Sequence, residues 1–326
     1  MDRRIGLDLA KGVFQAVLVE GRSRVAWDRR WRRNQVLAEL AKLEPVLVVM
    51  EACGGAMYWA REIGKLGHRV WLLPAQHVKP YRQGQKNDRT DARAIVEASF
   101  RSELHPVPIK NEDQQVMQAI GQMRRRLIRA RTALANQTRG ILAEFGVVLP
   151  RGIAVLRRQL PALCERLAPR LAALIELQYQ ELVAVDERIE AITDQLTRMA
   201  LTDAGCQRLM RLRGIGPITA VALVGHCCPT AYPNGRTYAA VLGVIPRHNA
   251  SGERVSLSRL TKSGNAELRT LLIHCGRSVV KTVHRHDDAQ SRWLSGVIAR
   301  RGKNKAAVAM ANKLARHAWA ELKRVA

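Results

Sequence analysis

Acidic side chains are scarce in this chain of 326 residues, which holds 28 Asp and Glu against 54 Lys and Arg. The formal net charge is +26, and the sequence pI is near 11.0. A surface that repels itself this strongly predicts a polyanionic partner, and nucleic acid is the first candidate. Because carboxylates are so few, each one inside an apolar segment calls for an explanation.

Long apolar runs and closely spaced cysteine pairs are missing as well. No run of 18 or more apolar residues occurs, so we expect no membrane span. Asp8 interrupts the first apolar stretch, which argues against a signal peptide. The six cysteines form no Cys-x-x-Cys pair, which argues against a zinc ribbon and favours reduced thiols. We therefore expect a cytoplasmic protein.

The length and a hydrophobic content of 47% predict a folded protein of two or three domains. Residues 1–110 have the pattern of an α/β domain. The expected elements are two strands in 3–20 with a turn at 11–12, a strand at 23–33, a helix at 34–43 capped by Asn34, a buried strand at 46–50, a helix at 54–67 and a strand at 68–73. Strands that come first and then alternate with helices predict a mixed sheet covered by helices.

Residues 111–200 predict two long helices, separated near residues 150–152. Heptad spacing relates the apolar residues Val116, Ile120, Met123, Leu127, Ala130 and Leu134, and again Leu182, Val185, Ile189, Ile192, Leu196 and Met199. This pattern favours an antiparallel helical hairpin or an intermolecular coiled coil, and two core helices of a bundle explain it about as well. Residues 201–304 form a third region with glycine and proline turns, and a final helix is expected within 305–326.

Four carboxylates stand out against the basic background. Asp8 lies in the first apolar strand, and Glu51 follows the buried run 46–50 directly. Asp88 and Asp91 are three residues apart at the start of a helical stretch, so they share one face. Salt bridges to nearby arginines explain either aspartate alone. The four together favour a site for Mg²⁺, in which two ions about 4 Å apart assist phosphodiester displacement.

The segments that contain these acids resemble a known family. Gly-Leu-Asp-Leu-Ala-Lys at 6–11, Glu-Ala-Cys-Gly at 51–54 and Lys-Asn-Asp-Arg-Thr-Asp-Ala at 86–92 are similar to the N-terminal domain of the DEDD transposases. These include insertion-sequence recombinases guided by a bridge RNA and the related pilin-gene invertases. The resemblance implies a RuvC-like domain with an RNase H-like fold. It also implies that Asp8, Glu51, Asp88 and Asp91 bind the metal.

The second half of the chain resembles the same family. Leu-Arg-Gly-Ile-Gly-Pro at 212–217 looks like a helix-hairpin-helix element, in which Gly214 and Gly216 would let the backbone approach a phosphate. The segments 242–247, 251–252 and 260–269 are similar to the family's C-terminal transposase domain, a mainly helical domain whose Ser-Gly step carries the nucleophile. The matching residue is Ser251. By residue type alone, a hairpin turn with a structural serine is the simpler explanation.

Basic residues suggest where nucleic acid is bound. Around the serine, the candidates for phosphate contacts are Arg247, Arg254, Arg259 and Lys262. On the first long helix they are Arg124, Arg125 and Arg129. The segment 284–288, His-Arg-His-Asp-Asp, has metal-ligand residue types without the spacing of a known site, so we interpret it as a polar loop.

The resemblance leads to a functional hypothesis: a bacterial, nucleoid-associated DNA recombinase with Mg²⁺, or Mn²⁺ in its place, and a serine nucleophile. It would bind donor and target double-stranded DNA and a structured guide RNA encoded by its element, as a homo-oligomer between a dimer and a tetramer. The expected domains are 1–110, 111–200, 201–304 and 305–326. The alternatives are a metal-dependent Holliday-junction-type endonuclease without a covalent intermediate, and a basic architectural DNA-binding protein.

Overall fold

The computed structural model describes residues 2–22, 24–82, 87–226, 231–251 and 254–324. Within residues 248–258 it describes only the backbone. The chain forms two compact units, Met1–Asn111 and Glu112–Ala326.

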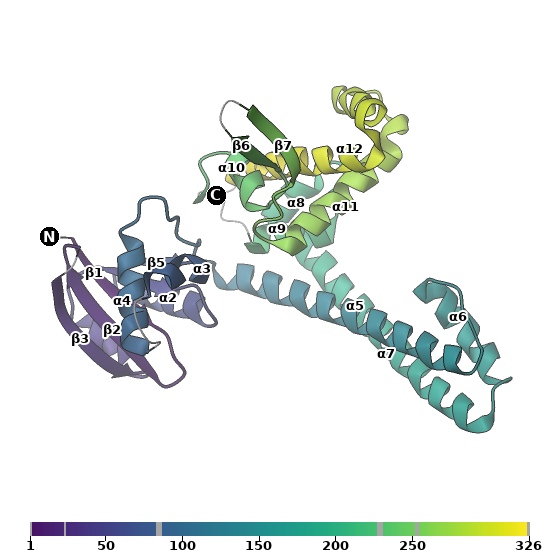
Figure 1. Cartoon of the computed structure of the whole chain (residues 1–326), viewed down its shortest axis with the longest axis horizontal. Helices are drawn as coiled ribbons and strands as arrows, with labels where there is room; N and C mark the ends of the chain where they lie inside the picture. The colour runs from purple at the N-terminus through teal and green to yellow at the C-terminus, as the bar shows by residue number, and fades with distance from the viewer. Residues whose placement is uncertain (1, 23, 83–86, 227–230, 252–253, 325–326) are drawn as a thin grey trace. The chain divides into compact units, whose positions relative to one another are not determined.

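The first unit is built on a five-stranded sheet (Figure 1). Its strands are β1 (Arg3–Asp8), β2 (Val13–Glu20), β3 (Arg24–Arg32), β4 (Leu47–Glu51) and β5 (Arg69–Leu73). They lie in the order β3-β2-β1-β4-β5. The first three strands pair antiparallel, whereas β4 runs parallel to both β1 and β5. This is the mixed sheet that the sequence pattern predicted.

Helices cover both faces of this sheet. The helices are α1 (Val36–Ala41), α2 (Ala56–Lys65), α3 (Ala75–Val78) and α4 (Asp88–Ser99), with a 3₁₀ turn at Lys79–Tyr81. On one face, α1 and α2 pack against alternate residues of the strands, such as Ile5 and Met50. On the other, α4 packs against Val17 and Val49. The expected cap of the first helix is wrong, because α1 has Gln35 rather than Asn34 at its N-cap and no side-chain capping bond.

The second unit is mainly helical. Its elements are α5 (Glu112–Glu144), α6 (Ile153–Cys164), α7 (Pro169–Thr202), α8 (Ala204–Met210), α9 (Pro217–His226), α10 (Gly235–Val241), β6 (Pro246–Ser251), β7 (Arg254–Leu260), α11 (Ala266–Thr282), a 3₁₀ turn (Val283–Arg285) and α12 (Ala289–Lys323). β6 and β7 form a two-stranded hairpin. A kink at Gly302, whose φ is 76°, divides α12, so the expected final helix is its second part.

The long helices α5 and α7 form an antiparallel hairpin within one chain. Arg131 bonds to Asp186, and Arg124 bonds to Thr193. The first heptad pattern is partly wrong: Val116 and Met123 are 54% and 51% exposed. Met117, outside that pattern, is buried instead. The reason is that α5 also packs on α9 and the core of the helical unit, which turns a different stripe inward.

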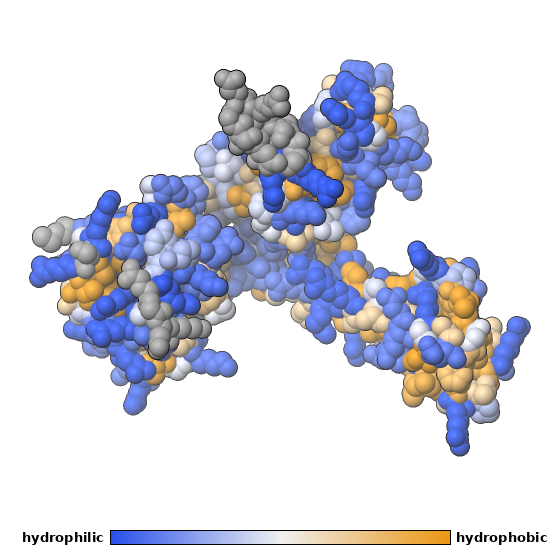
Figure 2. Space-filling view, viewed as in Figure 1, coloured by the Kyte–Doolittle hydropathy of each residue, from blue (hydrophilic) through white to orange (hydrophobic). Residues whose placement is uncertain are grey.

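The hairpin ends in an apolar tip closed by α6, whose Leu156 and Leu160 are fully buried there. Figure 2 shows hydrophobic surface gathered over this end of the unit. Its exposed apolar residues include Phe145, Val148, Leu174 and Leu177. Among the described residues, no helix is both long and apolar enough to cross a membrane.

Candidate active site

Asp8 and Glu51 end two neighbouring parallel strands. Leu7 of β1 pairs with Met50 of β4, so the residues that follow them lie side by side at the same edge. Side chains alternate between the faces of a strand. Because Val49 packs against α4, Glu51 belongs to the α4 face, and Asp8 shares that face with Gly6. The predicted pairing of these two acids therefore follows from register and alternation.

Gly6 brings α4 close to this pair. A Cβ atom built on Gly6 would lie 2.3 Å from the carbonyl oxygen of Ala92 and 2.5 Å from Cγ2 of Val96. Any larger residue would push the helix away from β1. Ala92 follows Asp91 directly, so the closest approach of helix and strand lies beside the acids.

The sequence also sets where α4 begins. The Oδ1 atom of Asn87 accepts the N–H of Thr90 at 2.8 Å, and the Thr90 hydroxyl accepts the N–H of Asn87 at 3.2 Å. This capping box starts the helix at Asp88. Asp88 and Asp91 therefore occupy the first turn, where the helix dipole favours negative charge. Asp88 is exposed, and Asp91 is half-buried.

The four carboxylates act on one another electrostatically. Burial raises the pKa of Asp8 to about 6, and repulsion from Asp91, Asp88 and Glu51 adds to this effect. Arg82 opposes the rise. The pKa of the Cys53 thiol is raised too, by burial first and then by Glu51 and Asp8. Acids from two strands and the first turn of one helix thus lie near enough to repel one another. That they bind a metal together stays a prediction.

Arg82, which the sequence analysis did not single out, is a counter-charge to these acids. Its guanidinium forms an ion pair with Asp91. The geometry is poor for a hydrogen bond, and Asp91 Oδ1 is buried without a hydrogen-bond partner in the described part of the chain. Within those same ranges, no three His, Cys, Asp or Glu side chains are grouped closely enough to hold a metal ion.

The chemistry of the donors nevertheless fits a divalent cation. Mg²⁺ and Mn²⁺ prefer carboxylate oxygens, and mutually repelling, partly desolvated carboxylates gain most from a bound cation. The Oδ1 atom of Asp91 is one such oxygen: it is ion-paired with Arg82 but accepts no hydrogen bond in the described part of the chain. Asp8, Glu51, Asp88 and Asp91 are the residues that would hold the metal.

Asp28 on β3 is a second residue that the sequence analysis missed. Its side chain is 13% exposed. It accepts hydrogen bonds from Gln15 and Arg89 and lies 3.7 Å from Arg93. Gln15 is paired with Asp8 across β1 and β2. Asp28 therefore holds two α4 arginines next to the acids. The sequence feature that could have revealed it is an acidic residue within an arginine-rich strand.

The predicted nucleophile lies in the β6–β7 hairpin. Ser251 is the last residue of β6, and its backbone pairs with Arg254. The side chains of both lie outside the described residues. Arg247, Arg259 and Lys262 are exposed. Lys262 has a φ of 55°, an unusual conformation for a residue with a Cβ atom.

Two glycines join the base of this hairpin to the helical unit. A Cβ on Gly243 would lie 2.1 Å from the carbonyl oxygen of Ser263, and one on Gly264 would lie 1.8 Å from that of Val241. Arg269 donates a hydrogen bond of 3.0 Å to the same Ser263 oxygen. These motif glycines are needed where the segments before β6 and after β7 touch.

The turn between α8 and α9 contains two glycines, Gly214 and Gly216, with different surroundings. Gly214 is packed against α11, whereas Gly216 has open space beside it. Gly214 has a φ of 98°, and a Cβ there would lie 2.5 Å from Cγ2 of Val279 on α11. Gly216 is exposed, and nothing lies within 4 Å of its Cβ position. Of the two predicted phosphate contacts, only Gly216 has open space beside it.

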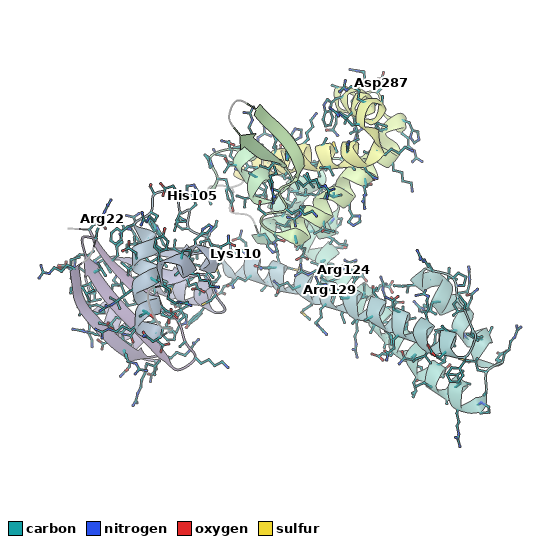
Figure 3. All side chains as sticks on the ribbon, in the orientation of Figure 1. Arg22, His105, Lys110, Arg124, Arg129 and Asp287 are labelled. Carbon is teal, nitrogen blue, oxygen red and sulfur yellow. The ribbon has the colours of Figure 1, made fainter. Side chains whose placement is uncertain are left out.

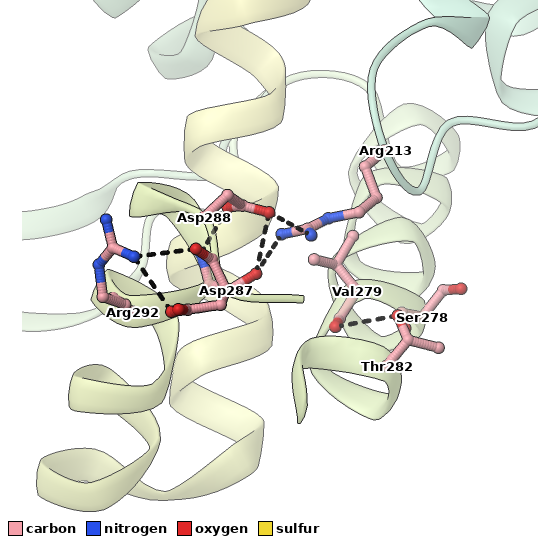
Figure 4. Close-up of polar contacts among 8 residues, drawn as sticks. Arg213, Ser278, Val279, Thr282, Asp287, Asp288 and Arg292 are labelled. Carbon is pink, nitrogen blue, oxygen red and sulfur yellow. Dashed lines mark hydrogen bonds and ion pairs between the residues drawn. The ribbon is translucent and has the colours of Figure 1, made fainter. Parts of the chain in front are cut away.

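Arg213 fastens this turn to the start of α12. Its Nη1 donates to Asp288 at 2.8 Å, and its Nη2 donates to Ser291 at 2.9 Å (Figure 4). Asp288 also caps α12 by accepting the Ser291 N–H. The histidine-rich segment that precedes α12 is thus a capped turn, in line with its interpretation as a polar loop.

The predicted nucleic-acid contacts on α5 have different surroundings. Arg124 is half-buried and donates to Thr193 Oγ1 at 2.7 Å. Arg125 forms an ion pair of 2.6 Å with Glu267 of α11. Arg129 is exposed. Figure 3 shows Arg124 and Arg129 on the same stretch of α5.

Comparison with known proteins extends this description. A transposase family model named DEDD_Tnp_IS110 matches residues 5–146, and a model described as the transposase IS116/IS110/IS902 family matches residues 206–293. The chain is 43% identical to a probable family 20 transposase of Pseudomonas aeruginosa over 327 aligned residues, covering 98% of this chain and 97% of that protein. The chain belongs to the IS110 family of transposases.

Two other transposases are similar along most of their length. The transposase for insertion sequence element IS1111A of Coxiella burnetii is 38% identical, with 98% of this chain and 89% of that protein covered. The transposase for IS1328 of Yersinia enterocolitica is 37% identical, with 97% and 95% covered. As an IS110-family transposase, the chain is an enzyme that acts on DNA. Its sheet unit is the RNase H-like DEDD domain, which implies metal-dependent catalysis.

Proposed function

We propose that this IS110-family transposase cuts and rejoins DNA through Ser251, assisted by Mg²⁺, or Mn²⁺ in its place, bound by Asp8, Glu51, Asp88 and Asp91. The observation that carries the proposal is the approach of these acids to one another in a half-buried place. Burial raises the pKa of Asp8 to about 6, and repulsion from Asp91, Asp88 and Glu51 adds to the rise. The match of the transposase model over residues 206–293 supports Ser251.

The chemistry of strand cleavage would be a displacement at phosphorus. Ser251 Oγ forms a bond to phosphorus, one P–O bond to a deoxyribose breaks, and the departing oxygen leaves as a hydroxyl group. A bound metal would neutralise the negative charge that develops on the attacking and leaving oxygens. Arg247, Arg259 and Lys262, which are exposed near the hairpin, hold the phosphate. Gly216 and the α5 arginines contact the DNA backbone further along.

Neither set of residues is complete alone, so the sheet unit and the hairpin must act together. We propose that they do so in a homo-oligomer between a dimer and a tetramer, bound to donor and target duplexes at the bacterial nucleoid. Mixing Ser251→Ala and Asp8→Ala chains tests this idea. Cleavage recovered in the mixture supports a shared site, and no cleavage at any ratio contradicts it.

A structured RNA encoded by the element would direct the choice of target. The charge of +26 supports simultaneous binding of RNA and DNA, because each neutralised phosphate releases counterions. The purified protein should then carry one discrete nuclease-resistant RNA. A mixture of random fragments, or no RNA, contradicts this part of the proposal.

A covalent-trapping experiment tests the nucleophile. The protein is incubated with Mg²⁺, RNA from the element's flanks and labelled junction DNA, and the products are separated under denaturing conditions. A protein–DNA adduct is expected from the wild type and from the control Ser256→Ala, but not from Ser251→Ala. Cleavage without an adduct, unaffected by Ser251→Ala, would instead support a metal-dependent junction endonuclease.

A further inference from the structure

A cavity of about 410 Å³ opens within the helical unit, where α5, α7, α9 and α11 meet. Its buried wall is apolar and includes Met117, Leu196 and Val221. Its exposed lining is polar and includes Arg129, Thr270 and His274. An apolar interior with a few polar groups at its opening is the usual construction of a ligand site, and the volume falls in the usual range.

The opening of this cavity carries an excess of positive charge. Arg124, Arg125 and Arg129 line it against the single carboxylate of Glu267, which is already paired with Arg125. Arg124 donates to Thr193 and has no carboxylate partner among the described residues. Burial and the neighbouring Arg131 lower the pKa of its guanidinium. Arg129 has no hydrogen bond or ion pair within those ranges. Two guanidinium groups at the opening are therefore available to an anion.

We propose that this cavity holds one unpaired base of a bound nucleic acid, with the flanking phosphates at Arg124 and Arg129. The proposal rests on the nucleic-acid contacts of α5 proposed above and adds a specific binding mode to them. An apolar wall accepts the face of a base that has left its stack. A base that is still paired in a duplex would not fit a pocket of about 410 Å³. Arginine forks suit phosphate oxygens.

The composition of the wall explains why a whole nucleotide is preferred over an anion alone. An isolated phosphate would need donors on several sides, whereas Met117, Leu196 and Val221 offer none. An apolar peptide would fill the interior but leave Arg124 and Arg129 without a counter-charge. A group with a flat ring, whose face is apolar, and an adjoining anion satisfies both parts. DNA and RNA share this chemistry, so the test includes both.

Two glycines of α5 allow a matched test. Gly121 lines the cavity, and its Cβ position has only Glu267 Oε1 at 4.0 Å. Gly121→Phe would fill the cavity without removing a charge. Gly140 lies on the same helix outside the cavity, with nothing within 4 Å of its Cβ position. Gly140→Phe is therefore the control for the same change in size and helix propensity.

The probes are single-stranded 20-mers, one of DNA with a central 4-thiothymidine and one of RNA with a central 4-thiouridine, and a plain DNA duplex. In the full-length wild type and in Gly140→Phe, photocrosslinks should map to 117–129 and 266–274. In Gly121→Phe these crosslinks should disappear. Affinity for the single strands should fall by about tenfold, which is the contribution that one stacked base makes to binding. Affinity for the duplex should stay unchanged. The strand that shows the loss identifies DNA or RNA as the source.

Equal crosslinking and affinity in Gly121→Phe and Gly140→Phe would overturn the proposal. If Gly121→Phe does not fold, as judged by circular dichroism, the exposed Arg129→Gln carries the test. It must weaken the single-strand complex more than the duplex complex, and an equal loss overturns the proposal too. A wild-type protein that binds none of the three probes would instead refute nucleic-acid contact by the α5 arginines.

Discussion

Replacing Gly6 by alanine tests how the acids are brought together. The added Cβ would lie 2.3 Å from the carbonyl oxygen of Ala92. A relaxed carbon–oxygen contact needs about 3.3 Å, so α4 and β1 must separate by about 1 Å. Overpacking of this kind costs about 1–3 kcal/mol of stability. The N-terminus of α4 would move when the helix separates from β1, and this movement would displace Asp88 and Asp91 from Asp8.

The effect on catalysis should exceed the effect on stability. A displacement of about 1 Å at reacting groups can lower a rate by about 100-fold. We expect Gly6→Ala to unfold at lower urea concentration and to cleave DNA in Mg²⁺ about 100-fold more slowly while still folded. Gly12→Ala is the control, because it adds the same methyl group in the turn between β1 and β2, where no atom lies within 4 Å.

Either of two results would refute this reasoning. A Gly6→Ala protein with the urea midpoint of the wild type would show that α4 does not approach β1 as closely as described. A protein that is destabilised but cleaves DNA at the rate of the wild type would show that the position of α4 does not determine the geometry of the acids.

Three further predictions follow from the same structure. Asp8→Asn should stabilise the metal-free protein in EDTA at pH 7, because the folded-state pKa of Asp8, about 6, lies above the unfolded value near 4. This gain in stability, measured by urea unfolding, should shrink as the pH falls from 6 to 4. A gain that does not depend on pH would contradict the prediction. Asp28→Asn should raise the Mg²⁺ concentration needed for half-maximal cleavage, because the released Arg89 can compete for Asp88, and Asp28→Glu should partly restore it; an unchanged requirement would show that Asp28 only stabilises the fold. Arg213→Ala and Asp288→Asn should each lower the urea midpoint, and the double variant should lose less than the sum of the two, whereas simple additivity would mean that their bond contributes nothing.

Much of the sheet unit could be predicted because its signals are local. The buried run at 46–50 became β4, which lies between β1 and β5, and alternation along 3–20 became the pair β1 and β2. The prediction failed where a neighbour decided the outcome. Asn34 did not become a cap, because β3 and a turn precede α1 and the helix begins two residues later.

The helical unit shows the same division. Heptad spacing correctly indicated that α5 and α7 pair, and residues such as Leu127 and Val185 do meet. It did not indicate that Val116 and Met123 would be exposed. A heptad pattern predicts the face of a helix that packs against one partner helix. α5 packs against several elements, and its packing against α9 turns a different face of α5 inward.

The sequence by itself determined the charge of the surface, the order of the elements and the placing of four acids in the first strand, after the buried strand and at the start of one helix. These features depend on composition and on periodicities of two or three to four residues, which adjacent residues set. Only the tertiary structure decided that Gly6 is the point of contact with α4, that Asp28 holds the α4 arginines, and that α5, α7, α9 and α11 enclose a cavity. Those features join residues far apart in the chain, and the close packing of side chains determines which of them meet.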